Sequence, residues 1–311
     1  MPSGPLWELP FQALLSPRNR YVLEDHAVFY APSLSVLREI RTKEGDTDLA
    51  GAGPGDDRAR VNSPSVLLAV ANPELMSGGR HSSSAPGDHQ YAPLREQEQL
   101  ARTLAQIYGL RNSTILTGKA ADEETVKTAA GRYKILHFAT HGVLDNEDPL
   151  YSGLLLSSAS KDEDGFLEAR EIMQMELHAE VAVLSACETA RGKVHEGEGV
   201  MGLSWALFVA GTPTTVVSLW QIDSAATAKM MTVFHRDLRS AMSQQQLPLT
   251  RTSALLHPRA SYRRLKSQNR ENAFAINKAQ ALRQAALALM AQPKYAHPFF
   301  WAAFVVVGDG F

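Results

Sequence analysis

The 311-residue sequence contains only one cysteine, Cys187, and its acidic and basic side chains nearly cancel, with a net charge of −2 at pH 7. A single cysteine excludes an internal disulfide framework and is typical of a reducing compartment. The near-balanced charge gives the chain no overall attraction for nucleic acid or for an anionic membrane. We therefore expect neither as a partner.

Long hydrophobic runs are also missing. The longest are about eight residues, of which 301–307 is typical, whereas a membrane-spanning helix needs about 20. Residues 1–5 lack the basic and apolar regions of a signal peptide. With 44% hydrophobic and 21% charged residues, the composition is that of a globular protein, and we expect it to be cytoplasmic.

Short apolar runs alternate with segments of helical spacing along most of the chain. The alternation predicts an α/β fold in three layers, with a central, mostly parallel sheet flanked by helices. The expected strands are 65–73, 113–116, the run ending at His141, the run ending near Cys187, 214–220 and 301–307. The expected helices are 94–108, 123–130, 167–175, 202–209, 225–238 and 273–290.

The domain organisation follows from where the alternation of expected strands and helices begins and ends. We interpret residues 1–60 as an N-terminal segment that packs on the core, the remnant of a preceding half-domain. Residues 61–311 form the main domain. Within it, 240–272 is polar, basic and without periodicity, which predicts a flexible, solvated insert.

Two of the apolar runs end in a side chain that can do chemistry. One ends in Phe138-Ala139-Thr140-His141-Gly142 and the other in Ser185-Ala186-Cys187. Parallel sheets gather such residues at the carboxyl edge of their strands. A thiol and an imidazole there form a nucleophile with its base, and the backbone N–H groups of Gly142 and Cys187 can hold an oxyanion. This chemistry needs no metal or organic cofactor. The alternative is that Cys187 is a small buried hydrophobic residue and His141 a packed histidine.

His137 lies four positions before His141, so on an extended strand it faces the same side. It competes with His141 for the role of base, or of a metal ligand beside it. Because it lies inside the apolar run and no third ligand is evident, we interpret it as a core residue.

A second motif competes for the same sheet. Residues 197–202 read Gly-Glu-Gly-Val-Met-Gly, and Asp223 follows 21 residues after Gly202, which is the outline of a dinucleotide-binding fingerprint. The glycines should follow their strand directly, yet about ten polar residues separate them from Cys187. We interpret the stretch instead as a flexible turn beside the site, whose glycines permit positive φ.

Several blocks of the chain resemble the CHAT family of caspase-like cysteine peptidases, which are related to caspases and separase and usually lie behind tetratricopeptide repeats. The blocks are Leu-Trp-Glu-Leu-Pro-Phe (6–11), Tyr-Ala-Pro-Ser-Leu (30–34), Leu-His-Phe-Ala-Thr-His-Gly (136–142), Leu-Ser-Ala-Cys-Glu-Thr-Ala (184–190), Gly-Glu-Gly (197–199), Val-Ser-Leu-Trp (217–220) and His-Pro-Phe-Phe-Trp-Ala-Ala-Phe (297–304). No tetratricopeptide repeat precedes them in this sequence.

The resemblance implies an endopeptidase in which His141 is the base and Cys187 the nucleophile. Ser185 would help to shape the pocket for the substrate side chain. Some relatives that are specific for basic side chains carry Asp at this position, so the Ser here weakens the case for a pocket dedicated to Arg or Lys. The stretch 218–223, with Ser218, Trp220 and Asp223, would bind an extended substrate along its edge.

The expected partners are a protein or peptide substrate and a regulatory repeat-containing protein. The oligomeric state stays open. A catalytically latent interaction or regulatory module is the alternative to the peptidase, and a dinucleotide-binding protein is the more remote one.

Overall fold

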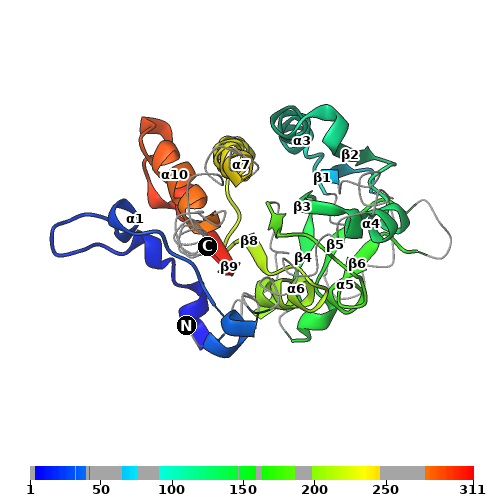
Figure 1. Ribbon diagram of the computed structural model, residues 1–311, viewed down its shortest axis with the longest axis horizontal. Coiled ribbons are helices and arrows are strands. Elements are labelled where there is room, and N and C mark those ends of the chain that lie inside the picture. The colour runs from blue at the N-terminus through cyan, green and yellow to red at the C-terminus, as the bar shows by residue number, and fades with distance from the viewer. Residues whose placement is uncertain are drawn as a thin grey trace, which may run out of the picture.

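A six-stranded sheet forms the centre of the protein in a computed structural model that describes residues 4–31, 33–39, 42, 65–75, 91–145, 147–158, 163–185, 198–245 and 277–311 (Figure 1). The strand order is β2-β1-β3-β7-β8-β9, in which the first five strands are parallel and β9 runs antiparallel to β8. Their bounds are β1 Ser65–Pro73, β2 Ser113–Gly118, β3 Tyr133–Ala139, β7 Val181–Leu184, β8 Thr214–Ser218 and β9 Phe304–Gly308.

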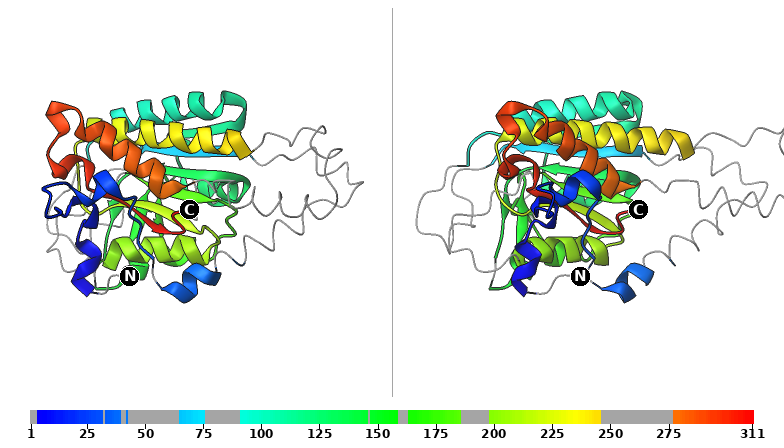
Figure 2. Two further views of the ribbon diagram at one scale, coloured as in Figure 1. Left: turned by 60° about the vertical axis from the view of Figure 1, so that its left-hand side comes forward. Right: turned by 90° about the vertical axis from the view of Figure 1, so that its left-hand side faces the viewer.

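Helices cover both faces of this sheet, as Figure 2 shows from the side. One layer contains α3 Arg95–Tyr108, α7 Ser224–Gln245 and α10 Lys278–Met290. The opposite layer contains α4 Glu123–Ala129, α5 Ala169–Ile172 and α6 Glu198–Val209. The described chain also contains two short helices, α1 Val22–Asp25 and α11 Pro298–Trp301, and helical residues at 34–39. The three-layer α/β fold predicted from the sequence is confirmed.

The strands are apolar on both sides because both of their faces are covered. In β1, Leu67 and Ala69 belong to the core under α3, α7 and α10, whereas Leu68 and Val70 belong to the core over α4, α5 and α6. All four side chains are fully buried. Alternation of side chains along a strand therefore divides one apolar run between two cores.

A smaller antiparallel sheet lies beside the carboxyl edge of β3. It consists of β4 Gly142–Val143, β5 Gly153–Leu155 and β6 Phe166–Glu168, in the order β4-β5-β6. β4 starts immediately after His141, and the His141 carbonyl accepts a hydrogen bond from the Leu155 N–H at 2.8 Å. The Thr140 hydroxyl also donates to the Leu155 carbonyl. The chain around His141 is thereby attached to β5.

The N-terminal segment packs along β9. Tyr30 donates its backbone N–H to the Val306 carbonyl at 2.8 Å, and its own carbonyl accepts from the Gly308 N–H at 2.8 Å. Gln12, which is buried, donates its side-chain amide to the carbonyls of Ala302 and Phe304. The boundary at residue 60 and the origin of this segment as a half-domain remnant stay predictions, since 43–64 lie outside the described residues.

Two predicted elements begin in a different kind of secondary structure from the one expected. The expected strand 301–307 begins only at Phe304, because Pro298 and the His297 ring, whose Nδ1 accepts the Phe299 N–H at 3.1 Å, start helix α11 first. The expected helix 167–175 begins as strand β6, and α5 starts only at Ala169, after a capping box between Glu168 and Glu171.

The prediction of a flexible insert at 240–272 is wrong for residues 240–245. Its first residues continue helix α7, which ends at Gln245 rather than at residue 238. Met242 is buried there and belongs to the core between α7 and its neighbours. Residues 246–272 lie outside the described part of the chain, so the remainder of that prediction is untested.

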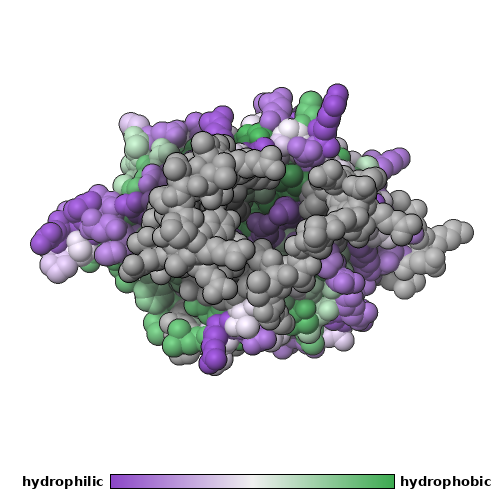
Figure 3. Space-filling view, in the orientation of Figure 1, coloured by the Kyte–Doolittle hydropathy of each residue, from purple (hydrophilic) through white to green (hydrophobic). Residues whose placement is uncertain are grey.

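Among the coloured residues on the face that Figure 3 shows, both hydrophilic and hydrophobic side chains are exposed. Hydrophilic side chains gather along its upper and outer margins, and hydrophobic ones along its lower margin, where Figure 1 places α6 and N-terminal elements. Exposed apolar side chains of these elements include Leu6, Trp205 and Val209. None of the helices in the described ranges is both long enough and apolar enough to cross a membrane.

Candidate functional site

The strands that precede the predicted base and nucleophile are neighbours in the sheet. Phe138 of β3 pairs with Leu184 of β7, and the Ser185 N–H donates to the Phe138 carbonyl at 2.9 Å. His141 comes three residues after Phe138, and Cys187 comes three residues after Leu184. Cys187 itself lies outside the described residues. Both strands end at the same, carboxyl, edge of the sheet.

His141 is buried, and its orientation is set by the segment that leads into α3. Its Nε2 lies 2.9 Å from the Ala92 carbonyl oxygen, and the Tyr91 ring packs 4.9 Å from the imidazole between ring centres. A carbonyl only accepts hydrogen bonds, so Nε2 carries the proton. In the neutral imidazole the lone pair is then on Nδ1, and Nδ1 is the atom that can accept a proton.

The Gly142 N–H points away from β5. Gly142 faces Leu154 across the antiparallel pair, and the Leu155 N–H donates to the His141 carbonyl. This pattern makes Gly142 and Leu154 a non-hydrogen-bonded pair, whose own N–H groups point outward. Because β4 is the edge strand of the small sheet, the N–H of Gly142 is directed away from that sheet.

Ser185 belongs to a buried chain of polar side chains. Its hydroxyl lies 3.0 Å from His137 Nε2 and 3.4 Å from the Phe138 carbonyl. His137 Nδ1 lies 3.0 Å from His235 Nε2, and His235 Nδ1 lies 3.0 Å from the Tyr108 hydroxyl. We call Tyr108, His235, His137 and Ser185 the buried relay. It joins α3, α7, β3 and the residue that follows β7.

The relay is uncharged. Burial lowers the pKa of His137 from its ordinary 6.5 to about 3, and burial beside His137 lowers the pKa of His235 well below its ordinary value. Burial also raises the pKa of the Tyr108 hydroxyl. Two neutral histidines can each donate through one ring nitrogen and accept through the other, so the relay is satisfied along its whole length. His137 is a core residue, as the sequence predicts.

The structure places the remaining predicted substrate-binding residues at the end of β8. Ser218 is buried in the last position of the strand and pairs with Phe304 of β9. Trp220 donates its indole N–H to the Phe299 carbonyl at 3.0 Å. Asp223 is exposed, and its carboxylate accepts the Ala226 N–H at 2.9 Å at the start of α7. Ser185, with its hydroxyl among the relay, is 5% exposed.

The glycine motif at 197–202 does not form a turn over its described part. α6 begins at Glu198, so Gly199 and Gly202 lie within a helix, and the expectation of a flexible turn is wrong for them. A Cβ added at Gly202 would come 2.8 Å from the Pro149 Cβ and 2.9 Å from its carbonyl. Close packing, rather than positive φ, explains this glycine. Gly197 lies outside the described residues.

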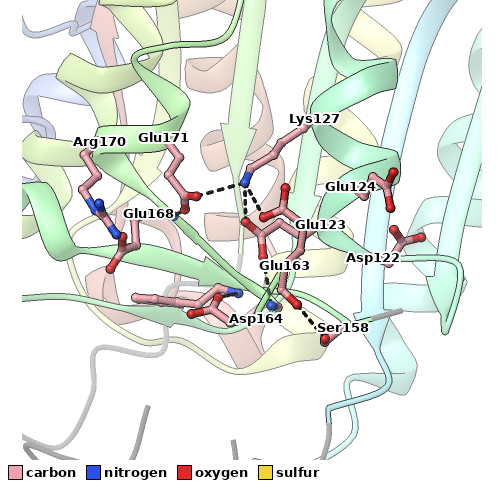
Figure 4. Close-up of polar contacts among 12 residues, drawn as sticks. Asp122, Glu123, Glu124, Lys127, Ser158, Glu163, Asp164, Glu168, Arg170 and Glu171 are labelled. Atoms are coloured by element: carbon pink, nitrogen blue, oxygen red, sulfur yellow. Dashed lines mark hydrogen bonds and ion pairs between the residues drawn. The ribbon is translucent and has the colours of Figure 1, made fainter. Parts of the chain in front are cut away.

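A second group of ionisable side chains lies between α4 and the β6–α5 segment (Figure 4). Lys127 Nζ contacts carboxylate oxygens of Glu123, Glu163 and Glu171 at 2.6, 2.7 and 2.9 Å. These three glutamates lie close enough together to ligate a metal ion. Lys127 already holds the centre of the group, which therefore joins α4 to the β6–α5 segment as an ion-pair network.

Burial and neighbouring charges together set the pKa values of the groups in this network. Burial raises the pKa of Glu123, although its ion pair with Lys127 opposes the rise. Burial opposes the charged form of Lys127, but the three carboxylates outweigh this and raise its pKa. The Gly165 N–H donates to the second oxygen of Glu123 at 2.9 Å, which ties the turn before β6 to α4.

Comparison with known proteins agrees with the resemblance seen in the sequence. The CHAT domain family matches residues 1–309. The chain belongs to the CHAT domain family. Two relatives are tetratricopeptide repeat protein 28 of Homo sapiens, 21% identical over 98% of this chain, and that of Mus musculus, 21% identical over 77% of it. This CHAT domain chain spans 12% and 10% of their lengths, respectively.

Two solved structures similar to this CHAT domain chain come from different organisms. One belongs to the Saccharomyces cerevisiae separase–securin complex, with 12% identity, a TM-score of 0.45, and coverage of 97% of this chain and 15% of that chain. The other is the complex of Porphyromonas gingivalis RgpB pro- and mature domains, with 11% identity and a TM-score of 0.43. The match covers 80% of this chain and 48% of that chain.

Sequence reasoning missed Ala92 and His235. Ala92 contributes only a backbone carbonyl, so its side chain gives no signal. His235 does leave a trace, because it is a polar residue within a helix whose other core positions, such as Met231 and Leu238, are apolar. A polar residue on the buried face of a helix indicates a buried partner.

Proposed function

We propose that this CHAT domain chain is a cysteine endopeptidase that cleaves protein substrates through Cys187 and His141. The observation that carries the proposal is the register between β3 and β7. Phe138 and Leu184 are paired, and the imidazole and the thiol each follow three residues later. Neighbouring strands are about 4.8 Å apart, and three residues reach about 10 Å, so the two side chains can meet.

The contacts of His141 support its role as the base. The Ala92 carbonyl fixes the Nε2–H, so the imidazole receives the thiol proton on Nδ1. A nucleophile, a base and a third group that orients the base form the usual arrangement for covalent catalysis. Here the third group is a backbone carbonyl rather than a carboxylate.

The proposed reaction has two steps. His141 takes the proton of Cys187, and the thiolate attacks the peptide carbonyl carbon; the oxyanion that forms accepts hydrogen bonds from the N–H groups of Gly142 and Cys187. The protonated imidazole gives its proton to the leaving amine as the C–N bond breaks, leaving a thioester. Water, activated by the same imidazole, then hydrolyses the thioester and restores the thiol.

Substrate would bind beside the ends of β7 and β8. Ser218, Trp220 and Asp223 stay the proposed substrate-contacting residues, as does Ser185. The side chains of Ser185, Trp220 and Asp223 each have a partner within the protein, and Ser218 is buried. Substrate would therefore pair mainly with the backbone beyond Ser218. A repeat-containing regulator is proposed as a second partner, since both relatives are named for tetratricopeptide repeats.

The test is a proteome-scale cleavage comparison of the wild-type protein with Cys187→Ala and His141→Ala. We expect new N-termini with the wild type and none with either variant. His178→Ala is the matched control, because that imidazole is exposed. Cleavage that persists in Cys187→Ala would rule out this mechanism.

Alkylation of the single thiol separates the peptidase from a latent interaction module. We expect iodoacetamide to label Cys187 rapidly at neutral pH, and at least tenfold more slowly in His141→Ala, because the base that forms the thiolate is gone. Equal, slow labelling of both proteins would favour the latent module.

A further inference from the structure

The end of strand β1 has an unusual backbone. Asn72 has a φ of +47°, and the pairing of β1 with β2 shifts register between Ala71 and Pro73. Among the described non-glycine residues, only Asn19 shares a positive φ. A left-handed backbone strains an ordinary residue, and Asn is among the residues that tolerate it best.

The side chain of Asn72 uses this backbone to reach the start of α3. Its Oδ1 accepts the Leu94 N–H at 2.8 Å, and its Nδ2 donates to Glu98 Oε2 at 3.1 Å. Leu94 is the N-cap of α3 and offers no side-chain cap of its own. Arg102 and Asn72 hold the pKa of Glu98 below its ordinary value, so Glu98 accepts as a carboxylate. One amide therefore joins the end of β1 to the first turn of α3.

The segment that Asn72 holds is the one that contacts the base. Leu94 lies two residues after Ala92, whose carbonyl accepts the Nε2–H of His141, and three residues after Tyr91, whose ring packs against the imidazole. Residues 91–94 have no regular secondary structure of their own. Their position therefore depends on such contacts with other elements.

We propose that Asn72 is a positioning residue for His141: it holds residues 91–94 so that the Ala92 carbonyl keeps the imidazole proton on Nε2. The inference rests on the proposed function, because Nδ1 must stay the proton acceptor toward Cys187. Asn suits the position because it provides an acceptor for Leu94, a donor for Glu98 and a side chain compatible with positive φ.

The decisive variant is Asn72→Gly. Glycine keeps the left-handed backbone without strain but removes both hydrogen bonds, so the fold is preserved while the contact is lost. We expect ¹⁵N NMR of His141 to show the Nε2–H tautomer in the wild type and a mixture of tautomers in the variant. We also expect kcat for cleavage to fall 10- to 100-fold with KM within about threefold, as for a misplaced catalytic group.

Asn19→Gly is the matched control. It replaces the other described asparagine with positive φ, in a turn where its backbone N–H bonds the Ser16 carbonyl. We expect neither the tautomer of His141 nor kcat to change. A second pair tests the hydrogen bonds themselves: Asn72→Asp places a carboxylate beside Glu98 and should lower kcat about tenfold, and Asn72→Asp/Glu98→Gln should restore most of it.

The two readouts separate this inference from the proposed function. If the wild type cleaves nothing, the NMR experiment still decides the role of Asn72. An Asn72→Gly protein that is folded and keeps the pure Nε2–H tautomer would overturn the inference. A loss of kcat that follows only a loss of thermal stability, with the tautomer unchanged, would overturn it as well.

Discussion

His137 and His141 are four residues apart on one run of chain, yet they have different surroundings. His137 lies within β3 and bonds to side chains from two other elements, His235 and Ser185. His141 lies past the end of β3 and donates to a backbone carbonyl from a segment before α3. The strand interior surrounds the first imidazole, whereas the second lies past the carboxyl end of the strand, which ends at Ala139. Position relative to the end of a strand, rather than residue type, separates a structural histidine from a candidate base.

The largest difference should appear on replacing each histidine by alanine. His137→Ala leaves buried polar atoms of His235 and Ser185 without their partner, so we expect a loss of about 3 kcal/mol in the free energy of unfolding. His141→Ala removes one hydrogen bond to a carbonyl and should cost about 1 kcal/mol, while it abolishes cleavage. Urea denaturation monitored by fluorescence measures both. Equal losses of stability would break the comparison.

The second prediction uses pH. Because the folded pKa of His137 is about 3 and that of His235 also lies far below 6.5, the unfolded chain binds protons there that the folded protein does not. Stability should therefore be constant above pH 6.5 and fall below it, by up to about 1.4 kcal/mol per pH unit for each histidine. The raised pKa of Glu123 acts in the opposite direction.

Denaturant midpoints between pH 7 and pH 5 test this slope. The variant His178→Asn removes an exposed imidazole and should leave the slope unchanged, whereas His137→Gln/His235→Gln should flatten it. A wild-type slope equal to that of the double variant would show that the relay does not exclude protons.

The smallest effect is expected at the far end of the relay. Tyr108→Phe removes the hydroxyl that bonds His235 and should cost about 1 to 2 kcal/mol, because the remaining ring nitrogen is fully buried. Tyr133→Phe is the control: its hydroxyl bonds Thr114 at 2.7 Å in a less buried place, where water can replace it, so a smaller loss is expected. Thermal unfolding of both variants makes the comparison; a larger loss in Tyr133→Phe would contradict it.

Much of the fold could be predicted because local pattern and burial agree. The buried run 65–73 and the amphipathic stretch 94–108 became β1 and α3 almost as expected. Two of the errors, at His297 and Glu168, occurred where short-range capping competes with hydrophobicity, since an apolar run does not show which backbone N–H groups are already satisfied.

For the candidate site too, some features could be predicted from the sequence and others could not. The sequence by itself indicated the two candidate side chains, their places at the ends of apolar runs and the family to which the chain belongs. Only the tertiary structure decided that β3 and β7 are neighbours in register, that a carbonyl from Ala92 holds His141, and that Asn72 holds that segment. These contacts join residues 20 to 50 positions apart through backbone atoms and chain direction, which leave no pattern along the sequence.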